Sequence, residues 1–163
     1  IDTTWYDEAG RDRGTVFHAL TVKVDQDVGG LWLHEWPADS RVQGRLVGYE
    51  RFLAECRPVY RDSEVELASD VLDFAGRVDR RCSSFLGRRA ILDFKPAGEA
   101  PWHGPQTWAY WYLDGADPKT RRFTVHFSDD GRYHLGAHTN WRDGFVFLDA
   151  LKDAQARARA FGF

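Results

Sequence analysis

The chain has 163 residues, 43% of them hydrophobic and 15% aromatic, with a formal net charge of −3 at pH 7. A chain of this size and composition can bury a large core, which excludes a disordered protein. The net negative charge argues against a non-specific nucleic-acid coat protein. No apolar run approaches the roughly 20 residues of a membrane span and no signal peptide is visible, so we expect no membrane partner. The chain begins at Ile1 and contains no methionine, so we expect that the residues before Ile1 in the natural protein are missing.

The chain contains two cysteines, Cys56 and Cys82. Two cysteines are too few for a disulfide framework or a thiolate cluster. Both lie among apolar residues, so we expect buried free thiols. This expectation fits a reducing, intracellular setting best.

The N-terminal third of the chain predicts two amphipathic helices. Apolar residues recur at helical spacing in both segments, and His18 lies on or beside the inward face of the first. Proline stops the second helix because it cannot continue one. The expected elements of this part are a polar lead-in over 1–13, a helix over 14–24, a loop over 25–36 and a helix from Ser40 to Pro58.

The remainder of the chain predicts a sheet covered by helices. Alternating apolar and polar residues indicate strands, and Asp129-Asp130-Gly131 is typical of a hairpin turn. The expected elements, in chain order, are strands over 63–69, 76–85 and 88–96, a helix over 101–113, a hairpin of strands over 121–128 and 132–138, and a closing helix from Asn140. The pattern over 1–163 therefore predicts one α/β domain with a central mixed β-sheet flanked by helices.

Two carboxylates and a lysine occupy central strand positions where a packed sheet usually has apolar residues. Because side chains alternate along a strand, Asp93 and Lys95 point to the same face. A hairpin turn midway between the two central strands places Asp79 opposite Asp93, and the preceding hairpin places Glu64 opposite Asp79. Carboxylates paired in this way lie about 5 Å apart and destabilise the sheet unless a cation sits between them. Glu66 shares a face with Glu64 and is the alternative to it.

Three carboxylates in a row predict a site for a hard divalent cation, Mg²⁺ or Mn²⁺. Such an ion suits phosphodiester hydrolysis because it polarises a phosphate and lowers the pKa of a bound water. Lys95 lies on the same face as Asp93, where it can stabilise the developing negative charge or help to deprotonate the attacking water. The alternative that the residues leave open is a buried Asp–Lys pair without a catalytic role.

Residues around these positions suit a nucleic-acid substrate. Gln106 and Tyr110 are four residues apart on a helix and share a face, from which they can orient a water or contact a DNA backbone. Arg77 and Arg80 begin a run of basic residues that can bind phosphates. Core packing of Tyr110 and a solvated strand face for the arginines are the alternatives. Aromatic surfaces for stacking an unpaired strand are offered by Trp102, Trp108, Trp111 and Trp141.

The order of these motifs resembles the PD-(D/E)xK nuclease superfamily, and most of all its RecB-like branch, which includes small phage exonucleases. The matching residues are His18 after Gly14-Thr15, Glu64, Gly76-x-x-Asp79, Asp93-x-Lys95 and Gln106-x-x-x-Tyr110. The resemblance covers roughly residues 13–150 and implies a restriction-endonuclease-like core. It implies that the histidine and both aspartates bind the metal and that the glutamate binds or shapes a second metal position. It also implies a catalytic lysine and a Gln/Tyr helix that supports DNA binding.

The resemblance makes the expected function that of a Mg²⁺- or Mn²⁺-dependent deoxyribonuclease. The expected activity is that of an exonuclease in DNA recombination or repair, in the cytoplasm of a bacterium or a phage-infected host. DNA is the expected partner, together with a recombinase or annealing protein or a second copy of the chain. A structure-specific endonuclease and a catalytically inactive DNA-binding or assembly module are the alternatives. The sequence departs from the branch at Pro96, which replaces a small hydroxyl residue, and it lacks the cysteines of an iron–sulfur cluster, so no cluster is expected.

Overall fold

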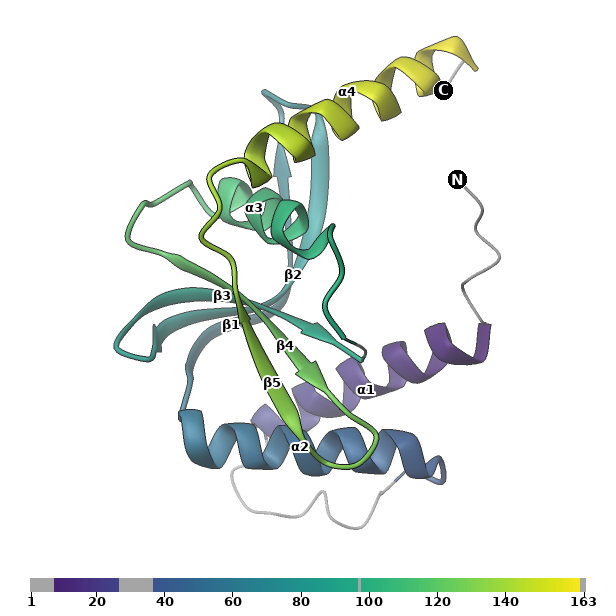
Figure 1. Cartoon of the computed structure of the whole chain (residues 1–163), viewed down its shortest axis with the longest axis vertical. Coiled ribbons are helices and arrows are strands. Elements are labelled where there is room, and N and C mark those ends of the chain that lie inside the picture. Colours follow the sequence, from purple (N-terminus) through teal and green to yellow (C-terminus); the bar gives the residue numbers. More distant parts are fainter. Residues whose placement is uncertain (1–7, 27–36, 97, 162–163) are drawn as a thin grey trace.

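The computed structural model describes residues 8–26, 37–96 and 98–161, and most of the loop expected over 25–36 lies outside them. The described chain forms helices on both sides of a five-stranded sheet (Figure 1). The elements are α1 (Glu8–Gln26), α2 (Ser40–Cys56), β1 (Val59–Ser69), β2 (Phe74–Phe85), β3 (Arg88–Lys95), α3 (His103–Leu113), β4 (Arg121–Phe127), β5 (Tyr133–Ala137) and α4 (Asp143–Ala160). The strands lie in the order β1-β2-β3-β4-β5. Only the β3–β4 pair is parallel, so the predicted α/β class with a mixed sheet is confirmed.

The helices form two layers, one on each face of the sheet. Figure 1 shows α1 and α2 below the sheet and α3 and α4 above it. The main core lies between the sheet and the α1–α2 layer and consists largely of aromatic rings. Its most deeply buried aromatic residues are Phe17, Tyr49, Phe52, Phe85, Phe94 and Phe127. On the other face α3 packs on the sheet, and α4 packs on α3.

The helix ends follow local signals where the sequence provides them. The Asp39 side chain caps α2 by accepting a hydrogen bond from the Arg41 amide at 2.8 Å. Arg57 then adopts a left-handed φ of 46° and its amide bonds the Leu53 carbonyl at 3.1 Å, which ends the helix before Pro58 as expected.

The first helix is longer than predicted. It begins at Glu8, within the segment 1–13 expected to be a lead-in, and it continues to Gln26. The sequence over 8–13 is mostly polar, and a polar turn gives no apolar period, so apolar spacing alone understates the length of such a helix. The extension places Asp25 on α1 rather than in a loop. The first strand is also longer than predicted, because β1 begins at Val59.

The cysteines and the apolar character of the helices concern two further expectations from the sequence. Cys56 and Cys82 are both free, and Cys82 is buried while Cys56 is half-buried. None of the helices in the described ranges combines the length and the apolar character that crossing a bilayer requires.

The α2 helix packs directly against the β4–β5 turn at Gly44. A methyl group at this position would overlap the carbonyl oxygen of Asp129. We therefore expect Gly44→Ala to lower the free energy of unfolding by about 1–3 kcal/mol, a typical cost of overpacking. Gly14→Ala is the matched control, because a methyl group at this position of α1 meets no atom within 4 Å. Replacing this helical glycine should stabilise the chain by roughly 0.5–1 kcal/mol. Urea denaturation of both variants checks the pair, and equal stabilities would contradict the close approach at Gly44.

Candidate active site

The candidate site lies where β2 and β3 separate. The last ladder pair at this end joins Arg80 to Leu92, and the same register sets Asp79 opposite Asp93, as predicted. Oδ2 of Asp79 accepts a hydrogen bond from the Phe94 amide at 2.6 Å. The Asp79 carboxylate therefore accepts the hydrogen bond that a backbone carbonyl of β2 would accept in a regular ladder. Asp79 and Asp93 are both buried, with exposed fractions of 7% and 2%.

The neighbouring strand brings Glu64 to the same place. The β1–β2 ladder pairs Ser63 with Arg80 and Val65 with Val78, so Glu64 lies opposite Asp79, in the predicted register. Glu64 has a φ of 52°, a left-handed conformation that is uncommon for residues other than glycine. This conformation interrupts the regular strand at the residue whose carboxylate reaches across to α1.

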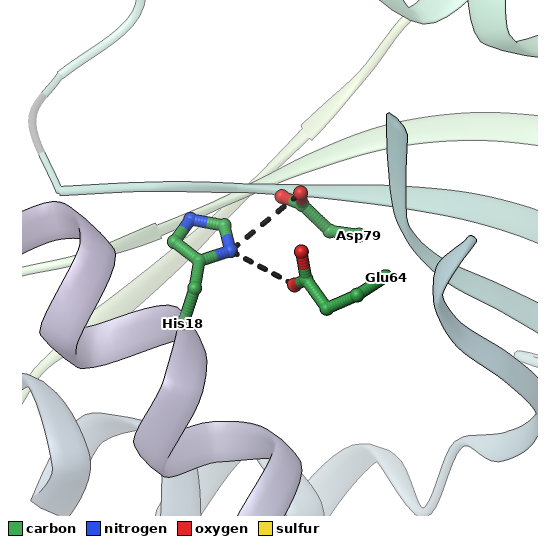
Figure 2. A group of neighbouring side chains, drawn as sticks. All are labelled: His18, Glu64 and Asp79. Atoms are coloured by element: carbon green, nitrogen blue, oxygen red, sulfur yellow. Dashed lines mark hydrogen bonds and ion pairs between the residues drawn. The ribbon is translucent and has the colours of Figure 1, made fainter. Parts of the chain in front are cut away.

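Helix α1 completes the group with His18. Nδ1 of His18 lies 3.1 Å from Oε1 of Glu64 and 3.5 Å from Oδ1 of Asp79 (Figure 2). One ligand atom from each of these three residues lies within 4.8 Å of the others. Within the ranges that the structure describes, this is the one group of three or more such side chains that is close enough to hold a single metal ion.

The protonation of these three residues is set by burial and by one another. Burial lowers the pKa of His18, but the hydrogen bond with Glu64 and the charges of Asp79 and Glu64 raise it overall. Burial raises the pKa of Glu64, yet the hydrogen bond and charge of His18, followed by the charge of Arg80, lower it overall. For Asp79 burial prevails, and its pKa is raised although His18 opposes the shift. The group therefore binds a proton easily when no cation is near.

Asp93 connects the acidic group to the lysine. Nζ of Lys95 lies 2.8 Å from Oδ2 of Asp93, so the two side chains share a face as predicted. Burial, and then the charge of Asp79, raise the pKa of Asp93 to about 7 despite the ammonium group. Oδ2 of Asp93 is buried and receives no hydrogen bond of normal geometry from the described residues. The cation that this oxygen meets within the described residues is the Lys95 ammonium.

The α3 helix holds Lys95 from the other side. Nζ of Lys95 donates a hydrogen bond to Oε1 of Gln106 at 3.0 Å. Nε2 of Gln106 donates in turn to the hydroxyl oxygen of Tyr110 at 2.8 Å. The Tyr110 ring packs against Gly76, where an added methyl group would lie 3.1 Å from the ring. Gln106 and Tyr110 therefore lie beside the lysine and share a face, and their polar groups orient its ammonium.

The prediction that Arg80 contacts a substrate is wrong for this structure. Arg80 has an exposed fraction of 0% and its guanidinium is used internally. Its nitrogens lie 2.8 Å from Oδ2 of Asp25 and 3.2 Å from Oε1 of Glu64. They also donate hydrogen bonds to Oγ1 of Thr21 at 2.8 Å and to the Asp79 carbonyl at 2.7 Å. Arg80 can be buried because its neighbours compensate its charge, and it joins α1 to the sheet beside His18, Glu64 and Asp79.

Arg77 differs from Arg80 in exposure. Its side chain is 64% exposed, and Nε lies 3.4 Å from Oε2 of Glu64. This arginine therefore lies at the rim of the candidate site with its guanidinium open to solvent. Its assignment to substrate binding stays a prediction.

Sequence reasoning missed two residues that support the site, Thr21 and Asp25. They follow His18 by three and seven residues on α1, so all three lie on one helix face. Thr21 is buried and Asp25 nearly so. Burial raises the pKa of Asp25, because desolvation outweighs the lowering by the charge of Arg80 and by the hydrogen bonds with Tyr49 and Arg80. Polar residues spaced i, i+3 and i+7 on a helix that must bury one face are the pattern in the sequence that could have indicated Thr21 and Asp25.

The donor set fits a hard divalent cation. Two carboxylates and an imidazole converge, and the buried carboxylate of Asp93 lies opposite Asp79 and pairs with Lys95. Burying carboxylates side by side is unfavourable unless a cation or a proton compensates their charge. The raised pKa values of Asp79 and Asp93 are the consequence expected of such a site in the absence of a cation.

Comparisons with known proteins identify no family. The sequence matches no protein-family model and no curated protein. Among solved structures, the crystal structure of SSO0001 is similar with a TM-score of 0.45 and 15% sequence identity, over 71% of this chain and 60% of that chain. The chain thus spans about 60% of the length of that protein. A likeness of this extent assigns neither a fold family nor a function.

The raised pKa of Asp93 makes the stability of the metal-free chain dependent on pH. A carboxyl group whose pKa rises on folding stabilises the fold while it is protonated, and that stability is lost as the pH passes from the ordinary value of 3.8 to about 7. We expect the free energy of unfolding of the wild type, relative to Asp93→Asn, to fall across this window. The slope should approach about 1.4 kcal/mol per pH unit for one proton.

Urea denaturation at a series of pH values, in EDTA and then in Mn²⁺, measures this difference. The cation competes with the proton, so Mn²⁺ should stabilise the wild type more near neutral pH than near the acid end of the window. A wild-type-minus-variant difference that stays level or rises with pH would contradict the assignment of Asp93.

Proposed function

We propose that the chain is a Mg²⁺- or Mn²⁺-dependent deoxyribonuclease of the PD-(D/E)xK type, with a restriction-endonuclease-like core. The observation that carries the proposal is the buried Asp79–Asp93 pair at the point where β2 and β3 separate. His18 and Glu64 lie on one side of this pair and Lys95 on the other. Acidic ligands suit a divalent cation that promotes phosphodiester hydrolysis, and a lysine beside them suits the stabilisation of the developing negative charge.

Each residue has a definable role in this proposal. His18, Glu64 and Asp79 would hold the ion, with Asp93 contributing its buried oxygen. When bound, the ion supplies a Lewis acid that polarises the phosphate and lowers the pKa of a water molecule.

Lys95 places a positive charge where negative charge develops on the phosphate. Gln106 and Asp93 fix its ammonium by contacts of 3.0 and 2.8 Å, so little reorganisation is needed during the reaction. In the alternative role, the neutral amine of Lys95 would accept the proton of the attacking water and become the ammonium.

The residue that supports DNA as the substrate is Arg77. Arg77 at the rim offers an exposed charge to a phosphate. Within this proposal we favour an exonuclease of recombination or repair that acts with a recombinase or annealing protein or as a homo-oligomer. A structure-specific endonuclease with the same residues is the nearest alternative.

Cleavage of labelled DNA by the purified chain tests the proposal. Linear duplex with labelled ends, the same sequence as single strands and closed circular DNA are each incubated with Mg²⁺, with Mn²⁺ and with EDTA. Release of the end label without cleavage of the circle supports an exonuclease, and cleavage of the circle supports an endonuclease. DNA binding without cleavage under any of these metal conditions would contradict the nuclease and favour an inactive DNA-binding module.

A further inference from the structure

A cleft of about 490 Å³ lies on the far side of α3 from Gln106 and Tyr110. Trp108 and Trp111 fall on the face of α3 opposite to those residues, as the helical spacing requires. The cleft is bounded by these tryptophans, by the start of β4 and by the segment that leads into α4. The lining residues that matter here are Trp108, Trp111, Trp141, Thr120, Arg121 and Arg122.

Aromatic surface dominates one wall of this cleft. The ring centroids of Trp108 and Trp111 are 6.0 Å apart, and Trp141 stands at the rim with 69% of its surface exposed. The Trp141 ring also lies edge-on to Phe145, with ring centroids 5.5 Å apart, and large exposed aromatic surface gathered in one place is typical of a binding site. Of the four tryptophans considered for stacking, the structure gathers three here. The fourth, Trp102, lines a different cleft.

The charge around the cleft is positive. Arg121 is exposed, and neither it nor Arg142 forms an ion pair within the described part of the chain. The Arg142 guanidinium lies 5.4 Å from the centre of the Trp141 ring. The acidic residue beside the cleft, Asp143, is compensated by Arg122 at 3.0 Å. Two uncompensated cations therefore flank the exposed tryptophan, which favours an anionic ligand with flat rings.

The cleft wall also contains an unused hydrogen-bonding group. Thr120 is 8% exposed and lines the cleft. Its Oγ1 is buried and has no hydrogen-bond partner among the residues that the structure describes. Native proteins satisfy most buried polar groups, so this unpaired hydroxyl marks a polar position in the cleft wall that the described protein atoms leave unsatisfied.

We infer that this cleft binds unpaired nucleotides of a DNA single strand. Bases stack on tryptophan regardless of sequence, and arginines track the phosphates between them. A paired duplex cannot offer the faces of its bases in this way. This inference rests on the proposed function, of which it specifies the substrate as single-stranded DNA or the unpaired end of a duplex.

The nucleotide held here is not the one that would be cleaved. Arg121 pairs with Ala90 and His126 with Lys95 across the parallel β3–β4 ladder. Five residues of strand therefore separate the cleft from the candidate catalytic lysine, which is about 16 Å at roughly 3.3 Å per residue. The cleft is a distant holding site that lets the chain retain its strand while the bond at Lys95 is cut.

Fluorescence anisotropy of a labelled oligothymidine tests the inference with the complete chain in EDTA, where cleavage is blocked. Trp141→Ala should weaken binding about 5- to 150-fold, the equivalent of the roughly 1–3 kcal/mol that one stacked base contributes. Arg121→Gln should lower the slope of log affinity against log salt by about 0.7, the value for one phosphate contact of a single strand. Both side chains are exposed, so neither variant should lose its fold.

Trp102→Ala and Arg51→Gln are the matched controls. Trp102 is exposed but lies outside the cleft, and Arg51 is exposed on α2, on the opposite face of the sheet. Both should bind like the wild type. Equal binding by all four variants, or a loss of affinity in Trp102→Ala but not in Trp141→Ala, would overturn the inference. If Trp141→Ala alone weakens binding while the wild type cleaves no DNA in Mg²⁺ or Mn²⁺, the single-strand site stands and the proposed nuclease fails.

Discussion

Lys95→Ala is expected to slow DNA cleavage about 100- to 10,000-fold, the range measured when one acid–base or charge-stabilising group is removed. The ammonium is held by Asp93 and Gln106 at 2.8 and 3.0 Å, so its charge is already placed for the reaction. Its removal deletes an interaction that strengthens as the phosphate gains charge. The rate constant under single-turnover conditions in Mn²⁺ measures the effect apart from product release.

Asp93→Asn should separate activity from stability. The variant should lose cleavage as Lys95→Ala does, because it loses a ligand oxygen and the partner of the lysine. Its melting temperature in EDTA should equal or exceed that of the wild type near neutral pH, because the unfavourable charge of a carboxylate buried beside Asp79 is removed, while Gln106 still accepts a hydrogen bond from Lys95. A loss of cleavage together with a large loss of stability would show only that the fold had failed.

Glu66→Gln is the matched control for these substitutions. Glu66 shares a strand with Glu64 but is exposed and pairs across the ladder with Arg77. The structure places Glu64, and not Glu66, within 3.1 Å of His18. Glu64→Gln should therefore weaken cleavage and Glu66→Gln should not. If Lys95→Ala and Asp93→Asn both cut DNA like the wild type, the site is assigned to the wrong residues.

Arg80→Met is expected to produce the largest loss of stability, about 3–5 kcal/mol, the range measured when one partner of a buried ion pair is removed. The substitution leaves Asp25 and Glu64 without their shared cation and Thr21 without a donor. It also removes the hydrogen bonds by which Arg80 joins Thr21 and Asp25 of α1 to the sheet. Urea denaturation in EDTA gives the free energy of unfolding.

Arg77→Met is the matched control for this variant. Arg77 is three residues away on the same strand, but its side chain is 64% exposed, so its loss should change stability by less than about 0.5 kcal/mol. Arg80→Lys should fall between the two, because lysine retains the charge but lacks the forked donors. Equal stability of Arg80→Met and the wild type would contradict the central role assigned to this guanidinium.

The pairing of the acidic residues could be predicted from sequence because hairpins are local. In both hairpins the turn lies between adjacent strands, so the turn position sets which residues face each other. Asp79 opposite Asp93 and Glu64 opposite Asp79 follow from counting outward from the two turns. The observed ladders have these registers. Alternation along β3 likewise places Asp93 and Lys95 on one face.

Contacts between distant segments could not be derived by counting along the strands. His18 is 46 residues from Glu64, and its place in the site depended on the family resemblance and on how α1 packs. Burial of Arg80 was missed because alternation shows which face a residue takes but not whether a helix covers that face. The length of α1 was missed because polar turns add no apolar period.

The sequence by itself therefore determined the order of the elements, the mixed sheet and the row of acids, since local hydrophobic period and turn position control them. The tertiary structure decided which charges are buried and which meet. It closed His18 onto Glu64 and Asp79, joined Lys95 to Gln106, and enclosed Arg80 between α1 and the sheet. These contacts join different elements of the fold, and the packing of helices on the sheet selects them. Such packing depends on the shapes and charges of many side chains at once.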